Sequence, residues 1–157
     1  MHLSYQHGYD ASADTVVALM ANPEFLADVA EHAGATSHEV RIVGSTTHIE
    51  MSLEAPSDVA RFVGKTIRVK QSLTWGQPDA QGVRRGTVDI DVAGLPVTAS
   101  AAAVLSPTGP NSSAGTYKGE LTVRIPLVGK KVEALVAPSI NEAFDGIERR
   151  AQEWLAR

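Results

Sequence analysis

Hydrophobic residues follow three successive periods along the chain, and each period predicts a different kind of element. Residues 2–9 alternate between two faces, which is typical of a β-strand. Residues 12–34 change to helical spacing, and Ser12 and Asn22 stand where N-cap residues are favoured. Pro23 follows in the first turn of the second helix, where its missing N–H group is tolerated. The chain therefore opens with a strand and two short helices.

A period of two dominates from about residue 36 to residue 126. It predicts six strands, centred on residues 39–42, 48–54, 67–75, 87–92, 97–105 and 117–125. We expect Ser57 to cap one helical turn that ends near Val63, and residues 106–115 to form a loop because they are rich in Gly, Pro and Ser. Short connections and one polar face per strand indicate an antiparallel meander with one face buried.

Helical spacing returns after Pro126 and continues to the C-terminus. Apolar residues recur every three to four positions from Val128 to Trp154, which predicts one helix of roughly 28 residues, about 42 Å long. Pro138 lies inside this helix and removes a backbone hydrogen bond, so we expect a kink there. No linker interrupts the pattern, so residues 1–157 are expected to form a single domain.

A long amphipathic helix and a one-sided sheet can each bury their apolar face against the other. We therefore expect an α+β fold of the helix-grip kind. In this arrangement a curved antiparallel sheet of about seven strands surrounds a long C-terminal helix, and two short helices follow the first strand.

Four segments support a more specific comparison. They are Tyr5 to Met20, the helix start Asn22-Pro23-Glu24-Phe25-Leu26, the segment Phe62-Val63-Gly64 before a strand ending at Trp75, and Ile125-Pro126-Leu127-Val128-Gly129-Lys130-Lys131-Val132-Glu133 at the start of the long helix. With the order of elements, they resemble the START-like superfamily, also called the helix-grip or Bet v 1-like fold, and within it an actinobacterial family of unknown function. The resemblance covers essentially the whole chain. It implies a cavity between sheet and long helix for an apolar small molecule. The superfamily includes lipid and sterol carriers, polyketide cyclases and aromatases, and chaperone co-regulators.

The composition of the chain limits its expected cellular environment and the classes of partner that it can bind. The chain has no cysteine, which excludes disulfides and thiolate metal sites, and its net charge is −4 without a basic cluster, which argues against nucleic acid as a partner. No apolar run approaches the roughly 18 residues of a membrane helix. The N-terminus lacks the features of a secretory signal, so a cytoplasmic location is expected. Oligomeric state stays open.

Small side chains predict where a ligand would lie. Aromatic residues make up only 5% of a chain that is 43% hydrophobic. The predicted strand at 97–105 places Ala99, Ala101 and Ala103 on its inner face, opposite the long helix. Such a surface forms either a preformed apolar pocket or a tight, dry contact between helix and sheet.

The candidate ligand-binding residues come from inward positions of the predicted strands and the long helix. They are His7, Met51, Gln71, Leu73, Trp75, Ile90, Ala99, Ala101, Tyr117, Leu135, Ile140 and Phe144. The inward polar positions are Tyr5, His7, Tyr9, His38, Gln71, Arg84 and Tyr117. Each could orient a ligand, lie at a strand end or be satisfied within the core. Gln71 and Tyr117 are the preferred candidates because they lie mid-strand among apolar neighbours.

No metal, cofactor or catalytic motif is present, because the five histidines lack metal-ligand spacing and no nucleophile or phosphate-binding motif occurs. The outward residues Lys65, Arg68 and Lys70 are expected to pair with carboxylates on neighbouring strands.

The sequence thus favours binding or transport of an apolar or amphipathic small molecule, such as a lipid, sterol or polyketide-like compound. One alternative is an enzyme of the polyketide cyclase or dehydratase type, whose only acid–base candidates would be His7, His38, Tyr117 and Arg84. The other alternative is a protein-interaction module, such as a chaperone co-regulator, that uses the outer sheet face or the acidic first 40 residues.

Overall fold

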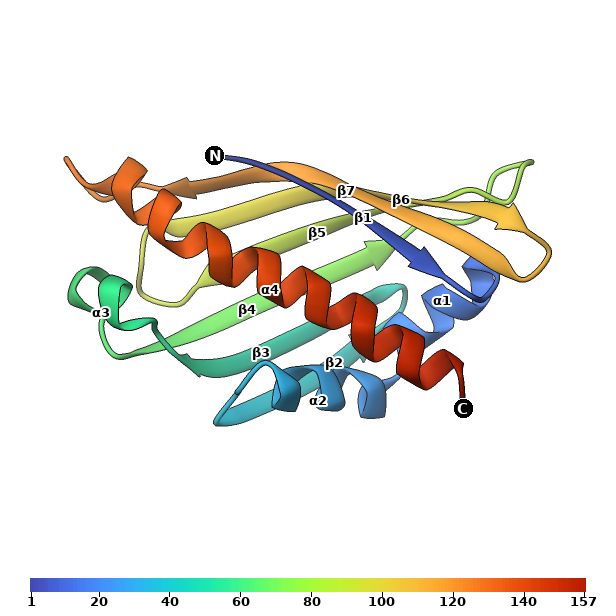
Figure 1. Ribbon diagram of the computed structural model, residues 1–157, viewed down its shortest axis with the longest axis horizontal. Coiled ribbons are helices and arrows are strands. Elements are labelled where there is room, and N and C mark those ends of the chain that lie inside the picture. Colours follow the sequence, from blue (N-terminus) through green and yellow to red (C-terminus); the bar gives the residue numbers. More distant parts are fainter.

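The computed structural model describes residues 1–157 and contains one seven-stranded antiparallel sheet and four helices (Figure 1). The strands are β1 (His2–Tyr9), β2 (Ser37–Val43), β3 (Thr46–Glu54), β4 (Thr66–Trp75), β5 (Arg84–Val92), β6 (Val97–Gly109) and β7 (Ser112–Val123). The helices are α1 (Ala13–Met20), α2 (Pro23–His32), α3 (Ser57–Val63) and α4 (Gly129–Leu155). The predicted α+β helix-grip fold is confirmed.

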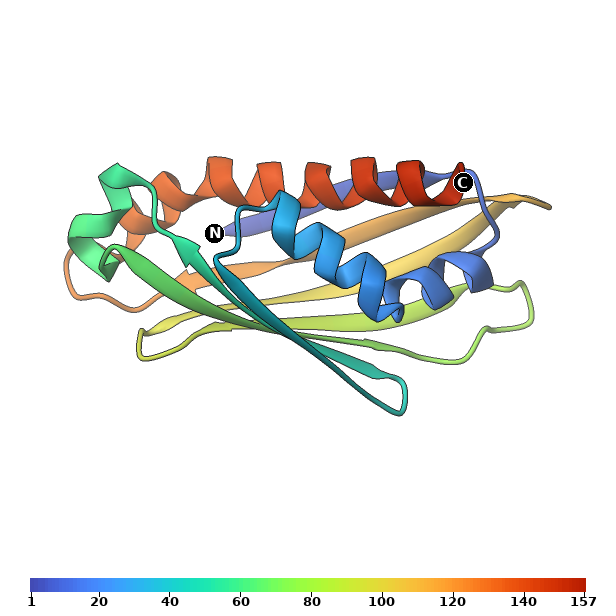
Figure 2. The ribbon, with the colours of Figure 1, turned by 90° about the horizontal axis from the view of Figure 1, so that it is seen from below.

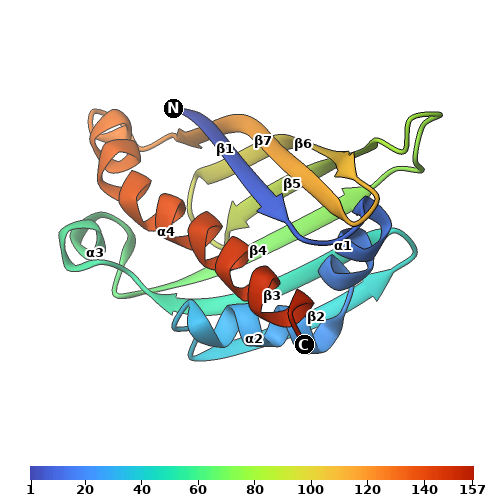
Figure 3. The ribbon, with the colours of Figure 1, turned by 45° about the vertical axis from the view of Figure 1, so that its right-hand side comes forward.

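The sheet has the order β1-β7-β6-β5-β4-β3-β2, so β1 and β2 are its two edges. Helix α4 crosses one face of the sheet diagonally (Figure 1), and the sheet curves beneath it (Figure 2). Helix α3 lies beside the N-terminal end of α4, whereas α1 and α2 lie toward its C-terminal end (Figure 3). All four helices therefore lie on one side of the sheet and leave its outer face to solvent.

The first two helices begin where the sequence predicts. The Ser12 side chain accepts a hydrogen bond from the backbone N–H of Thr15, and Asn22 accepts one from Glu24. Each cap satisfies a backbone donor that the first helical turn leaves free. The expectation for Ser57 is wrong, since α3 begins at that residue after Pro56 and has no side-chain cap.

The predicted loop at 106–115 is also wrong, because most of it is strand. Strand β6 continues to Gly109 and β7 begins at Ser112, which leaves a very short hairpin connection. An irregular register between Pro107 and Gly109 accommodates the proline, which cannot donate to the ladder. The Ser113 hydroxyl donates to the carbonyl of Ala11 and ties this hairpin to the start of α1. The other end of β7 lies two residues before the predicted end, at Val123.

Helix α4 spans 27 residues, and Pro138 lies inside it without interrupting the helix. Near its C-terminal end, the Asp28 carboxylate of α2 accepts hydrogen bonds from Arg150 Nε (2.7 Å) and Trp154 Nε1 (2.9 Å). Burial alone would raise the pKa of Asp28, but these hydrogen bonds and the Arg150 charge outweigh it and lower the pKa. This carboxylate therefore fixes one end of α4 to α2.

A second carboxylate fixes the other end of α4. Glu133 is buried, and its Oε1 accepts a hydrogen bond from the backbone N–H of Val123 at 3.2 Å. Its Oε2 lies 3.7 Å from the positively charged N-terminus of Met1. A buried carboxylate needs such partners, because burial removes its hydration. Glu133 thus joins the start of α4 to the end of β7 and to the chain's first residue.

The buried apolar residues form two separate clusters, one at each end of α4. The larger cluster joins β1, α1, α2 and the C-terminal part of α4, and contains Tyr9, Ala13, Val16, Met20, Phe25, Leu26, Ile49, Trp75, Ala103, Leu105, Tyr117 and Ala151. The smaller cluster contains Val59, Val123 and Val132. The accessible surface is 8603 Å², whereas a compact monomer of this mass exposes about 7,600 Å². The buried apolar residues are therefore divided into two groups, and the chain exposes more surface than a compact monomer of its mass.

Strands β6 and β7 approach each other so closely at Gly119 that a side chain has no room there. A Cβ atom at this position would collide with the carbonyl oxygen of Ser100 and lie 2.6 Å from Ala101 Cα. We expect Gly119→Ala to lower the free energy of unfolding by about 1–3 kcal/mol, because the two strands must separate. Chemical denaturation measures this loss. In the control Gly8→Ala the new Cβ meets nothing within 4 Å, and an equal loss in both variants would contradict the argument.

Candidate functional site

The middle of the inner sheet face consists of small and aliphatic residues in register. One cross-strand row contains Ala99, Ile90 and Gln71, and the next contains Ala101, Val88 and Leu73. Of these six residues only Val88 is buried. Met51 on β3 is half-buried as well. Met51 and Leu73 pack against the larger cluster, whereas Ile90, Ala99 and Ala101 belong to neither cluster and are only partly covered.

Helix α4 spans this region without packing closely on it. Its main contacts are with the edge strand β1, its neighbour β7, and helices α2 and α3, and its contacts with strands β3 to β6 are fewer. The helix residues Leu135, Ile140 and Phe144 are half-buried. Leu135 packs against the smaller cluster, whereas Phe144 packs against the larger one together with Met51 and Leu73 of the sheet. Of the positions that the sequence assigns to a ligand, Ile90, Ala99, Ala101 and Ile140 belong to neither cluster.

Polar side chains form a buried chain at the edge of the larger cluster. His7 Nδ1 lies 2.8 Å from the Tyr9 hydroxyl, which lies 3.0 Å from the Tyr117 hydroxyl. All three residues are buried, and His7 is only 5% exposed. His7 Nε2 makes no hydrogen bond of regular geometry, although the backbone of Phe144 lies close enough to act on the ring as a hydrogen-bonding partner. The chain of polar groups thus ends in a ring nitrogen without a well-formed hydrogen bond.

The hydrogen-bond count favours one direction for this chain. If Tyr117 donates to Tyr9 and Tyr9 donates to His7 Nδ1, then the only unpaired group is the N–H at His7 Nε2. The opposite direction would also leave the Tyr117 hydroxyl proton without an acceptor. Because unpaired buried groups are costly, we assign the first arrangement. His7 Nε2 is then a hydrogen-bond donor.

The surroundings of His7 shift its pKa from the ordinary value of a histidine. Burial lowers the pKa of His7, and the nearby carboxylates of Glu148 and Asp145 and the Phe144 backbone oppose this shift without reversing it. Burial also raises the pKa of Tyr9 and of Tyr117, so both hydroxyls stay protonated. The network is therefore neutral near pH 7, and the charges that act on it from α4 are negative.

Phe144 links this network to α4. Its ring stacks on Tyr5 at 4.1 Å between centroids and lies 5.6 Å from Tyr117 and 6.1 Å from His7. The Tyr5 hydroxyl donates to Asn141 Oδ1, one helical turn before Phe144. Because Phe144 is half-buried and contacts the rings of the buried network, it connects the network with the open middle of the interior.

Trp75 and two of the predicted inward polar residues lie elsewhere. Trp75 is buried in the larger cluster with its ring against Gly86, and its Nε1 has no partner. Arg84 bonds the Gly76 carbonyl and Asp14 of α1, so it supports a turn. His38 lies 3.6 Å from a carboxylate oxygen of Glu31 on α2. Arg84 and His38 therefore already have partners outside the region between the clusters.

Sequence reasoning did not select Tyr9 or Asn141 as site residues. Tyr9 is the centre of the polar chain, although its inward position was recognised from the strand alternation. Its role depends on a contact with Tyr117, which lies 108 positions away in the sequence. Asn141 stands beside the apolar stripe of α4, three residues before Phe144, and this helical spacing is the only sequence signal for it.

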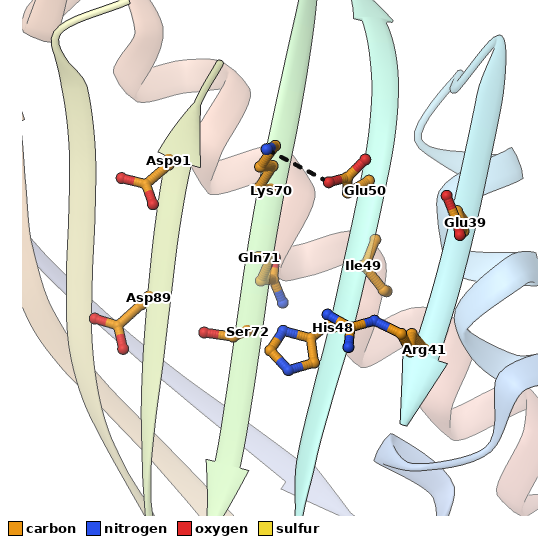
Figure 4. A pocket seen from close by; sticks show the side chains of 10 residues that line it. All are labelled: Glu39, Arg41, His48, Ile49, Glu50, Lys70, Gln71, Ser72, Asp89 and Asp91. Atoms are coloured by element: carbon orange, nitrogen blue, oxygen red, sulfur yellow. Dashed lines mark ion pairs between the residues drawn. The ribbon is translucent and has the colours of Figure 1, made fainter. Parts of the chain in front are cut away.

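The outer face of β2 to β5 carries a separate, polar hollow of about 350 Å³ (Figure 4). Eight of its lining residues alternate to the outer face, namely Glu39, Arg41, His48, Glu50, Lys70, Ser72, Asp89 and Asp91, and the inward-alternating pair Ile49 and Gln71 borders it as well. Arg68 and Lys70 pair with Glu50 at 2.9 and 3.6 Å, which confirms the predicted cross-strand pairing for these two bases. No group of three or more His, Asp or Glu side chains is arranged to hold a metal ion.

The chain matches one family over nearly its whole length. Residues 4–155 fit the model of the family described as "Protein of unknown function (DUF2505)". The chain belongs to this family. None of the curated proteins compared with it matches in sequence. None of the family member's helices here is both long and apolar enough to cross a membrane.

Solved structures confirm the START-like fold of this family member. The protein TTHA0849 from Thermus thermophilus has a TM-score of 0.69 and 17% identity, and the alignment covers 99% of this chain and 97% of that one. The Zhui aromatase/cyclase from Streptomyces sp. R1128 has a TM-score of 0.59 and 13% identity over 100% and 94% of the two chains. Human STARD10 has a TM-score of 0.65 and 12% identity over 96% of this chain and 62% of its own. At these identities the similarity establishes the fold alone.

The buried position of His7 predicts a pH dependence of stability. The folded-state pKa of His7 lies below its ordinary value of 6.5, so below that pH the unfolded chain binds a proton that the folded chain does not. The contribution is fully present above pH 6.5 and is lost as the pH falls toward the folded-state pKa. NMR titration of the His7 ring should give a midpoint below 6.5, and a midpoint above it would contradict this assignment.

Proposed function

We propose that this protein binds a neutral amphipathic small molecule, such as a lipid alcohol, a sterol or a polyketide-like ketone, between the sheet and α4. The observation that carries the proposal is the set of half-buried small and aliphatic residues Ile90, Ala99 and Ala101, which lie on the inner face of the sheet and belong to neither buried cluster. Apolar surface left accessible inside a fold is stabilised when a ligand removes it from water. The name of one structural neighbour, the Zhui aromatase/cyclase, is compatible with this class.

The polar network indicates which kind of oxygen-containing group the ligand carries. As assigned above, His7 Nε2 presents an unpaired N–H donor, so its natural partner is a carbonyl or hydroxyl oxygen. Because Nε2 is buried in the ligand-free chain, the proposal requires that the half-buried Phe144 ring, 6.1 Å from the His7 ring, shift when the ligand binds. A carboxylate ligand is disfavoured, because Asp145 and Glu148 act on His7, and the two least exposed arginines that form ion pairs, Arg84 and Arg150, already have carboxylate partners.

In this arrangement the oxygen of the ligand lies at the His7 end, near the C-terminal half of α4. Its apolar body lies over Ala99 and Ala101 and faces Leu135 and Ile140 of the helix. Burial of its hydrocarbon supplies most of the binding free energy, at roughly 25 cal/mol for each Å² of apolar surface. The hydrogen bond to His7 contributes mainly to orientation and selectivity.

Purified protein should carry or take up such a molecule. Native mass spectrometry followed by organic extraction identifies a bound mass, and a fluorescent hydrophobic probe measures uptake by ligand-free protein. The expected result is one neutral molecule per chain. A protein that carries no bound mass and takes up no probe would overturn the proposal.

Two alanines on the same strand provide a matched test of location. Ala101 faces α4 and is half-buried, whereas the next residue, Ala102, lies on the outer face and is exposed. We expect Ala101→Leu to weaken probe binding at least tenfold because its side chain occupies the proposed site, and Ala102→Leu to leave binding unchanged. Thermal unfolding confirms that both variants fold. Equal binding by both would place the ligand elsewhere.

Ligand selectivity tests the role of His7. A long-chain alcohol should bind at least tenfold more tightly than the fatty acid of equal length at pH 7, measured by displacement of the probe. His7→Leu should remove most of the preference for the alcohol over the corresponding hydrocarbon. Tighter binding of the fatty acid would contradict the assigned donor at His7.

A further inference from the structure

The two edges of the sheet are covered differently. At the β1 edge, the backbone N–H of Gly8 donates to Glu148 Oε2 at 2.7 Å, and Gln152 Nε2 lies 3.5 Å from the Gly8 carbonyl. Side chains of α4 therefore occupy hydrogen-bonding groups at this edge. This protection suits an edge strand, whose free backbone groups otherwise attract another strand.

The backbone groups at the β2 edge have no comparable cover, although α2 packs on β2 and Glu31 of α2 lies 3.6 Å from His38. None of the residues 37–43 makes a hydrogen bond outside the ladder with β3. Two of the three large hydrophobic residues exposed on the chain, Ile42 (39% exposed) and Val43 (53%), lie on this strand. The strand contains no Pro, Gly or Lys, the residues that commonly oppose pairing at an edge. Figure 2 shows the β2–β3 hairpin extending below α2.

The sequence of β2, Ser-His-Glu-Val-Arg-Ile-Val, is complementary to itself in antiparallel pairing. If two copies pair about a twofold axis at Val40, then Glu39 of one copy lies opposite Arg41 of the other, and this happens twice. Glu39 and Arg41 both lie on the outer face, and neither forms an ion pair within its own chain. The inner face then pairs Val40 with its counterpart, which places two β-branched side chains opposite each other, and pairs Ile42 with His38.

We propose that two copies of this protein associate through β2, edge to edge and antiparallel, into one continuous sheet. The interface is isologous, so a single patch serves both copies. On the outer face, the row of His48 and Arg41 from one copy then continues into Glu39 and Glu50 of the other, along the hollow in Figure 4. The hydrogen bonds of the new ladder satisfy the backbone groups that a single copy leaves to water.

A contact between two seven-residue strands is smaller than a standard stable interface, so we expect a reversible dimer with a micromolar Kd. The four charges at the interface are near the surface. Their interaction is therefore expected to weaken as salt screens it, and dimerisation should be stronger at low ionic strength. Pairing through β2 leaves α4 and the inner face of the sheet free, so this proposal and the proposed ligand site are tested separately.

Charge reversal tests both the surface and the register. Sedimentation equilibrium of the full chain at 10–200 µM, on the order of the expected Kd, measures association. Glu39→Arg and Arg41→Glu each place like charges opposite each other, so each variant alone should dimerise at least tenfold more weakly than the original chain. An equimolar mixture of the two restores opposite charges at both positions and should form a heterodimer. The double variant E39R/R41E keeps its complementarity and should dimerise like the original chain.

Each outcome bears on the proposal. Recovery of association in the mixture and in the double variant supports antiparallel pairing centred on Val40, because a change in folding would not be repaired by mixing. A chain that stays monomeric at about 200 µM and at low salt would overturn the proposal. A dimer that is unaffected by both single reversals would also overturn it, since the contact would then lie elsewhere. Circular dichroism verifies that all variants are folded.

Discussion

Two carboxylates, Asp28 near one end of α4 and Glu133 near the other, tie the long helix to its neighbours through directed hydrogen bonds. Each lies beside an apolar cluster, so polar anchoring and hydrophobic burial act at the same two places. Between them the sheet curves beneath the helix (Figure 2). The two carboxylates thus hold the helix near its ends, and the sheet residues Ile90, Ala99 and Ala101 belong to neither cluster.

The small residues of β6 and β7 affect how much of the interior is filled by side chains. The alanines of β6 and Gly119 of β7 let neighbouring strands approach closely, but they present little side-chain volume to the helix. A protein interior normally packs densely, and here the aromatic rings that could fill it gather at the His7 end of the interior. The same gathering encloses the neutral chain of His7, Tyr9 and Tyr117, in which only one donor remains without a partner. The interior therefore combines a polar end with an apolar middle, as an amphipathic ligand requires.

The backbone groups at the two edges of the sheet are also covered unequally, because α4 passes over only one of them. The C-terminal half of the helix passes over β1, where Glu148 and Gln152 reach backbone groups of Gly8. No helix side chain makes such a bond with β2 at the opposite edge, so that strand keeps its own exposed apolar and charged residues. One helix placement thus accounts for both the open interior and the unequal edges.

Local sequence determined the elements. The caps at Ser12 and Asn22, the alternation of the strands and the helical stripe after Pro126 depend on neighbours within a few positions, so the order of elements and the inward residues could be predicted from them. The hairpin at 106–115 could not, because its Gly, Pro and Ser residues become strand only through pairing across β6 and β7. Likewise, alternation places Tyr9 and Tyr117 inward, but only the fold brings their hydroxyls within 3.0 Å. Whether small side chains leave an open or a closed interior depends on where α4 is anchored, and that is decided by tertiary contacts between Asp28, Glu133 and partners distant in the sequence.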